Sequence, residues 1–200
     1  RQLSIASCLQ LEWDLPGVFR PTNSMRMVRA PACVVINLDR DTDRLAHMQR
    51  ELDKAGLAFE RFAAIKGSEL PERLKPYFPT VKNQDLAPLS MGEIGTLQAP
   101  VVVLEDDVEL PPDFAALVSA LLERLPDEWD FVRLSNDTKR AVMPLDRLNG
   151  GFELVRYTNV PTSTGASLVS RVGAEIFLKQ TPRALPVDQE LRRIWVWKLN

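Results

Sequence analysis

The ten residues VVVLEDDVEL, at positions 101–110, join a continuous apolar run to three adjacent carboxylates. Such an apolar run is typical of a strand that is covered on both faces of a sheet. In α/β proteins, ligands bind at the carboxyl ends of strands of this kind. The stretch therefore predicts a buried strand of an α/β fold, with Glu105, Asp106 and Asp107 at a binding site.

Strand and helix patterns alternate along the rest of the chain. Apolar runs predict strands, and apolar residues at three- and four-residue spacings predict helices. A glycine at position 56 suits the left-handed end of a helix that starts after Asp41 or Thr42. These patterns predict strands over 32–37, 58–65, 129–134, 151–157 and 166–170, and helices over 42–55, 114–125, 172–179 and 187–199. The expected fold is α/β, with a mostly parallel sheet flanked by helices.

Composition limits the class of protein. The chain has 200 residues, of which 45% are hydrophobic and 26% charged, and its net charge is -2. We expect one globular domain over residues 32–200, preceded by an extension of unknown role over 1–31, where no periodicity is evident. The net charge gives no attraction to nucleic acid. Without a membrane-spanning run or a leader pattern, and with two cysteines in no ligand spacing, we expect a cytoplasmic protein.

The three acids have two interpretations. Side chains alternate along a strand, so Glu105 and Asp107 point to one face and can converge, while Asp106 points to the other. A divalent cation such as Mn²⁺ or Mg²⁺ would relieve their repulsion and leave positions for phosphate oxygens. Alternatively, the acids only begin a surface loop, and Glu109 and Asp113 favour the start of the next helix.

Four segments resemble glycosyltransferase family 25, which includes the lipooligosaccharide galactosyltransferases of Gram-negative bacteria. In family order they are VVINLDRDTDRLAHMQRELDKAGLAFERFAAIKG at 34–67, LSMGEIGT at 89–96, VVVLEDDVEL at 101–110 and LPVDQELRR at 185–193. The resemblance implies a GT-A-like, Rossmann-type fold and metal binding by Glu105, Asp106 and Asp107. It also implies a UDP-sugar donor, usually UDP-galactose, and transfer with inversion to a saccharide or glycolipid acceptor.

The first of these segments implies the nucleotide site. Arginine guanidinium groups suit a diphosphate, and a glycine at a strand exit lets the backbone approach a ligand. On its own, Arg44 could equally pair with a helix neighbour such as Asp41. The residues that the resemblance places around the nucleotide are Asn37, Asp39, Arg40, Arg44, Ala64 and Gly67.

An inverting transfer needs a base that takes the proton from the acceptor hydroxyl. Asp188 matches the family's acid near the end of the matching region, although an aspartate after Pro-Val is also an ordinary helix N-cap. Glu93 is the second candidate, and its alternative role is a capping box with Ser90. His47, the only histidine in the sequence, is predicted to face solvent on its helix.

The resemblance departs from the family in one place. Only residues 97–100 separate the LSMGEIGT segment from the acidic strand, where the family has a longer stretch. Either the chain carries a deletion there or the sequence omits residues. A catalytically inactive nucleotide- or glycan-binding module is therefore the alternative function, whereas a phosphotransferase is disfavoured because no P-loop is present. A lipid-borne acceptor would bring the protein to the inner membrane face.

Overall fold

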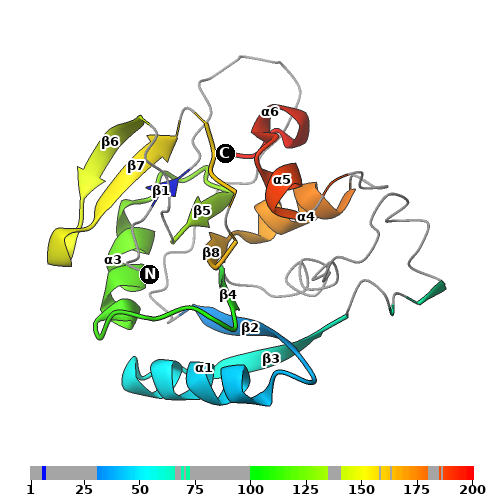
Figure 1. Cartoon of the computed structure of the whole chain (residues 1–200). Helices are drawn as coiled ribbons and strands as arrows, with labels where there is room; N and C mark the ends of the chain where they lie inside the picture. The colour runs from blue at the N-terminus through cyan, green and yellow to red at the C-terminus, as the bar shows by residue number, and fades with distance from the viewer. Residues whose placement is uncertain are drawn as a thin grey trace.

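The computed structural model describes residues 6–7, 31–65, 69, 71–72, 100–134, 141–157, 159–162, 164–179, 185 and 187–200. These residues form one eight-stranded sheet with helices on both faces (Figure 1). The predicted α/β class is confirmed, and the architecture is compatible with a GT-A-like, Rossmann-type fold.

The elements have the following bounds. The strands are β1 (Ala6–Ser7), β2 (Ala32–Leu38), β3 (Phe59–Ala64), β4 (Val101–Glu105), β5 (Phe131–Arg133), β6 (Val142–Arg147), β7 (Glu153–Tyr157) and β8 (Ala166–Val169). The helices are α1 (Thr42–Lys54), α3 (Phe114–Arg124), α4 (Arg171–Lys179), α5 (Val187–Leu191) and α6 (Ile194–Trp197), with a 3-10 turn at η3 (Asn149–Gly151).

The order of strands in the sheet is β3-β2-β4-β8-β5-β1-β7-β6. Strand β2 runs parallel to β3 and to β4. Together, β2, α1 and β3 form the predicted strand-helix-strand block. Strand β8 lies between β4 and β5 and runs antiparallel to both. Five of the eight described strands share one direction, and β3, β2 and β4 form a parallel block, so the described sheet is mixed. The position of β8 brings a late segment of the chain beside the acidic strand.

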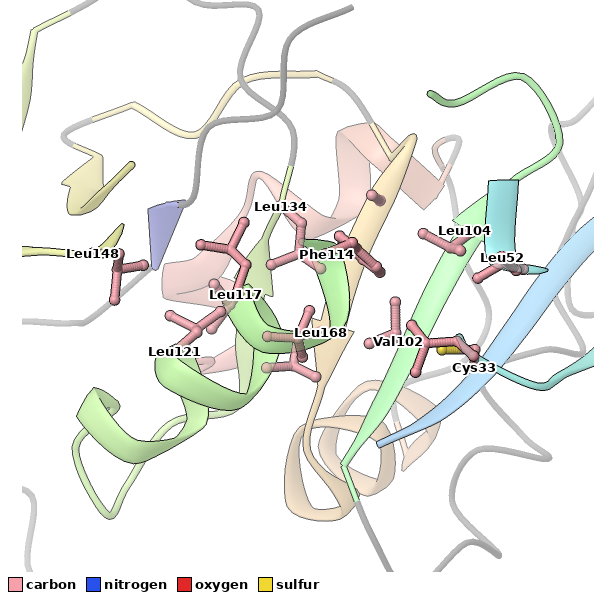
Figure 2. Packing of buried hydrophobic residues seen from close by; sticks show 14 of the residues in the cluster. Cys33, Leu52, Val102, Leu104, Phe114, Leu117, Leu121, Leu134, Leu148 and Leu168 are labelled. Atoms are coloured by element: carbon pink, nitrogen blue, oxygen red, sulfur yellow. The ribbon is translucent and has the colours of Figure 1, made fainter. Parts of the chain in front are cut away.

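Each face of the sheet has its own core because side chains alternate along β4. Val102 and Leu104 belong to a cluster that α1 and α3 cover, and Figure 2 shows this packing around Phe114 and Leu168. The neighbouring Val103 belongs to the opposite cluster, which α4, α5 and α6 cover. A strand buried on both faces therefore accounts for the continuous apolar run in the sequence.

Helix α1 forms as its pattern predicts. Asp41 is the N-cap residue, and Met48 and Leu52 are fully buried against the sheet. Gly56 follows the helix with φ +67°, a conformation that costs a glycine little. The backbone thus turns directly into β3, and the first turn of α1 remains beside the carboxyl end of β2.

Two features differ from the sequence-based expectation. Strand β6 was not predicted. In the described sheet it pairs only with β7, and all its residues are exposed, so its sequence shows no alternation of apolar and polar residues. The single helix expected over 187–199 is wrong, since the chain forms α5 and α6 with a break between them. The break lets Trp197 pack on Phe177, at 5.1 Å between ring centroids, and donate to the Glu190 carbonyl at 2.7 Å.

The part of the chain before residue 31 contributes β1, which lies between β5 and β7. The expected boundary between an extension and the main domain stays a prediction.

Cys33 is buried in β2 with a free thiol, and burial raises the pKa of that thiol to about 11. Within the described ranges, no helix combines the length and apolar character needed to cross a bilayer.

Candidate active site

A pocket of about 400 Å³ opens at the carboxyl ends of β2 and β4. Its walls come from these strand ends, the first turn of α1, β8 and α5. This is the edge at which α/β sheets bind ligands. The pocket brings together most of the sequence-predicted residues that the structure describes. Those that line it are Asn37, Arg40, Arg44, Ala64, Glu105, Asp106 and Asp107.

The middle acid, Asp106, is the centre of a hydrogen-bond network. Its Oδ2 accepts from Asn37 Nδ2 at 2.7 Å, and its Oδ1 accepts from Arg44 Nη1 at 3.0 Å. The hydrogen bond and the charge of Asp106 raise the pKa of Arg44. Arg44 thus pairs with Asp106, whereas Asp41 pairs with Arg40 at 3.5 Å. The network fixes the β4 turn to β2 and α1.

A second layer of contacts orients Asn37. Arg61 on β3 donates from Nε to Asn37 Oδ1 at 3.1 Å, and from Nη2 to Asp39 at 2.5 Å. Asn37 Nδ2 also donates to the Asp41 carbonyl at 2.9 Å. Asp39 is highly exposed and does not line the pocket, so the structure does not bring it to the other predicted nucleotide residues. Sequence reasoning missed Arg61, which has no motif signal of its own.

Glu105 lies between the sheet and the pocket. Thr164 Oγ1 donates to the Glu105 carboxylate. The backbone N–H of Glu105 donates to the Gly165 carbonyl at 2.8 Å. Burial raises the pKa of Glu105, and the negative charges of Asp107, Asp106 and Asp188 raise it further, while the Thr164 hydrogen bond lowers it. The ionised carboxylate is therefore unfavourable here in the absence of a positive charge.

We expect Glu105→Gln to raise the melting temperature at pH 7. A carboxyl whose pKa is higher in the folded than in the unfolded state binds its proton more tightly when folded, so it destabilises the protein as pH rises above the ordinary value of 4.5. Glutamine removes this effect and keeps the shape. Thermal unfolding from pH 4 to 8 should show a difference that grows with pH, and an equal difference throughout would contradict the explanation.

Of the two remaining acids, Asp107 lines the pocket, whereas Asp188 lies close to Glu105 without lining it. Asp107 is exposed and lines the pocket just after β4. Asp188 lies in the first turn of α5, not at the N-cap, and its charge acts on Glu105. Val187 and Leu191, on either side of it in the same helix, line the pocket. The tertiary structure therefore places Asp188 near the acidic turn, 81 residues away along the sequence.

Gly67 and Glu93 lie outside the described residues. The expectation that His47 faces solvent is wrong, because this side chain is half-buried and its Nε2 lies 3.0 Å from the Val108 carbonyl oxygen. That contact fixes α1 to the loop after the acidic strand. Thr164 and Ser167 line the pocket and were missed, because their place depends on the insertion of β8.

The acids of the pocket suit a divalent cation only as part of its ligand set. Within the described ranges, no group of three or more histidine, cysteine, aspartate or glutamate side chains is arranged to hold a metal by itself. Asp106 is bonded to Asn37 and Arg44, which leaves Glu105 and Asp107 as the carboxylates directed to the pocket. Such an oxygen pair fits a cation that takes its other ligands from a substrate.

A model of glycosyltransferase family 25, described as an LPS biosynthesis protein family, matches residues 30–190. This range contains the β2-α1-β3 block, the acidic strand and α5 up to Glu190.

The chain belongs to glycosyltransferase family 25.

Two curated family 25 proteins are similar to it, both called "Glycosyltransferase 25 family member". The one from Anopheles gambiae is 27% identical over 183 residues, which cover 78% of this chain and 30% of that protein. The one from Aedes aegypti is 27% identical over 186 residues, which cover 78% of this chain and 29% of that protein. The family 25 chain described here thus spans under a third of either relative.

Proposed function

We propose that the protein is a metal-dependent, inverting glycosyltransferase that transfers a hexose, galactose in our assignment, from a UDP-sugar to a saccharide acceptor. The observation that carries the proposal is the convergence of three groups on one pocket: the guanidinium groups of Arg40 and Arg44, the acids Glu105 and Asp107, and the α5 segment with Asp188. A donor with an anionic diphosphate and a neutral sugar matches this combination of charge and apolar wall.

The chain's own groups divide the work on the donor. Arg40 and Arg44 lie at the β2–α1 side, where their guanidinium groups would bind diphosphate oxygens. Glu105 and Asp107 would hold Mn²⁺ or Mg²⁺, and the cation supplies positive charge to the leaving diphosphate. Asp106 acts indirectly, because it holds Arg44 at 3.0 Å and Asn37 at 2.7 Å.

The transfer step requires a base on the face of the sugar opposite to the leaving group. Asp188 would accept the proton of the acceptor hydroxyl as the hydroxyl oxygen attacks C1 and the C1–oxygen bond to the diphosphate breaks. Its position on α5, between the pocket-lining Val187 and Leu191 and close enough to act on Glu105, supports this role. A saccharide that grows on a lipid carrier at the cytoplasmic face of the inner membrane would be a suitable acceptor.

Calorimetry of the purified protein with UDP, with and without Mn²⁺, tests the nucleotide and the metal together. We expect binding with Mn²⁺ and binding at least about tenfold weaker without it, because the cation links the acids to the diphosphate. Absence of UDP binding in the presence of Mn²⁺ would contradict the proposal.

Turnover separates an enzyme from the alternative, an inactive binding module. The purified protein is incubated with UDP-galactose, Mn²⁺ and a panel of saccharide acceptors, and the products are examined by NMR. We expect galactose linked with inverted anomeric configuration. UDP binding without any transfer would favour the inactive module, which the short 97–100 segment of the sequence also favours.

A further inference from the structure

Ser167, on β8, has a buried hydroxyl that bonds to no other group in the described part of the chain. The residue is 4% exposed and lines the pocket, and its Oγ finds no hydrogen-bond partner among the described residues. By contrast, the Oγ of Ser170, three residues further on, accepts from the Gly173 N–H at 2.9 Å. Buried hydroxyls without partners are rare because they lose their bonds to water and gain nothing in return. The exception at Ser167 points to a ligand in the pocket.

The surroundings of Ser167 are apolar on the side of β4 and α5, whereas the buried Arg133 is opposite it on β5. In the sheet register, Ser167 is opposite Val103, which lies two residues before Glu105 on the same face of β4. Phe131 and Val169 line the pocket on the same side, and Val187 lines it from α5. Among the described residues, Ser167 is therefore a hydroxyl on the apolar side of the pocket, level with Val103, with the buried Arg133 as its neighbour in the sheet.

The position of this part of the pocket indicates which portion of a donor it would contact. The charged part, with Arg40 and Arg44, is at the β2–α1 side, whereas the apolar part borders α5, the helix that carries Asp188. In the proposed reaction, the sugar must lie between the diphosphate and the base. Its ring carbons would then contact the apolar wall, and one of its hydroxyls would meet Ser167 Oγ.

We propose that Ser167 is a specificity-determining residue that forms a hydrogen bond with a hydroxyl of the transferred hexose. The inference rests on the proposed function and adds a residue that no motif assigns. A buried polar group discriminates strongly, because a sugar that presents no partner leaves the serine hydroxyl unsatisfied. The affinity for free UDP, which has no hexose, should not depend on Ser167.

The test compares the affinities of Ser167→Ala and the unmodified protein for UDP and UDP-galactose, by calorimetry with Mn²⁺ and without acceptor. UDP-glucose replaces UDP-galactose if the unmodified protein prefers it. We expect the variant to bind UDP as before and the UDP-hexose about tenfold more weakly, as for the loss of one neutral hydrogen bond. The melting temperature should not fall, since the removed hydroxyl has no partner in the ranges that the structure describes.

Ser170→Ala is the matched control, because Ser170 follows the same strand and its buried hydroxyl does have a partner. We expect it to lower the melting temperature and to leave the ratio of UDP to UDP-hexose affinities unchanged. A purely structural role for Ser167 would make its variant behave like this control, and that result would overturn the inference.

Two further outcomes separate the inference from the proposed function. Suppose that the unmodified protein binds both UDP and the UDP-hexose, and that Ser167→Ala weakens the two affinities equally or leaves both unchanged. The sugar contact is then wrong, and the glycosyltransferase proposal stands. If the unmodified protein binds no UDP with Mn²⁺, the proposed function fails and the inference about Ser167 fails with it.

Discussion

Asp188→Asn is expected to lower kcat for transfer from UDP-galactose by about 10²–10⁴-fold, the range that a positioned base contributes. Asparagine has the same shape but cannot accept the proton of the acceptor hydroxyl. The donor KM should change little, because Asp188 acts on the acceptor. Stability should not fall, since the negative charge of Asp188 is one of the causes that raise the pKa of Glu105. Steady-state kinetics and thermal unfolding measure both effects.

Asp127→Asn is a matched control for this variant. Asp127 is exposed in the segment between α3 and β5 and does not line the pocket, so its replacement should leave kcat unchanged. Retention of more than half of the original kcat by Asp188→Asn would remove Asp188 as the base. Glu93 would then be the remaining candidate from the sequence.

Asp107→Asn is expected to lower kcat/KM by about 10²–10³-fold, the loss seen when charge stabilisation of a leaving group is removed. Asp107 is exposed at the mouth of the pocket, and its contribution to the fold is small. We therefore expect Mn²⁺-dependent UDP binding to be lost while the melting temperature is retained. Calorimetry with increasing Mn²⁺ measures the effect, and an unchanged Mn²⁺ requirement would show that this acid does not hold the cation.

The neighbouring acid gives the sharpest comparison. Asp106→Asn removes one acceptor oxygen, so either the buried amide of Asn37 or the half-exposed guanidinium of Arg44 loses its partner. We expect the free energy of unfolding to fall by about 1–3 kcal/mol even without metal or nucleotide. Chemical denaturation of the two variants side by side should therefore separate adjacent residues: Asp106 stabilises the fold, and Asp107 acts on the ligand.

The β2-α1-β3 block was predictable because its signals are local. The apolar run of β2, the stripe with Met48 and Leu52, and Gly56 at φ +67° each depend on residues a few positions apart. The acidic end of β4 was equally clear, since a strand covered on both faces must consist of consecutive apolar residues. The exposed edge strand β6 and the break before α6 were not predictable, because the first lacks burial and the second depends on Trp197 meeting Phe177.

The site shows the same division. The sequence alone determined which residue types end the parallel strands and, through the family resemblance, which acids and arginines belong together. It did not reveal that Asp106 would be bonded by Arg44 and Asn37, nor that Arg61 would hold Asn37 from the next strand. It also gave no reason to select Thr164 or Ser167.

What only the tertiary structure decided follows from the order of strands in the sheet. Periodicity reports which face of its own element a side chain occupies, and this local property is present in the sequence. The insertion of β8 next to β4 is a pairing between segments more than 60 residues apart, and it is set by how the two cores pack on opposite faces of the sheet. That packing brings Ser167, Thr164 and α5 to the acidic turn, and so it decided the inner wall of the pocket.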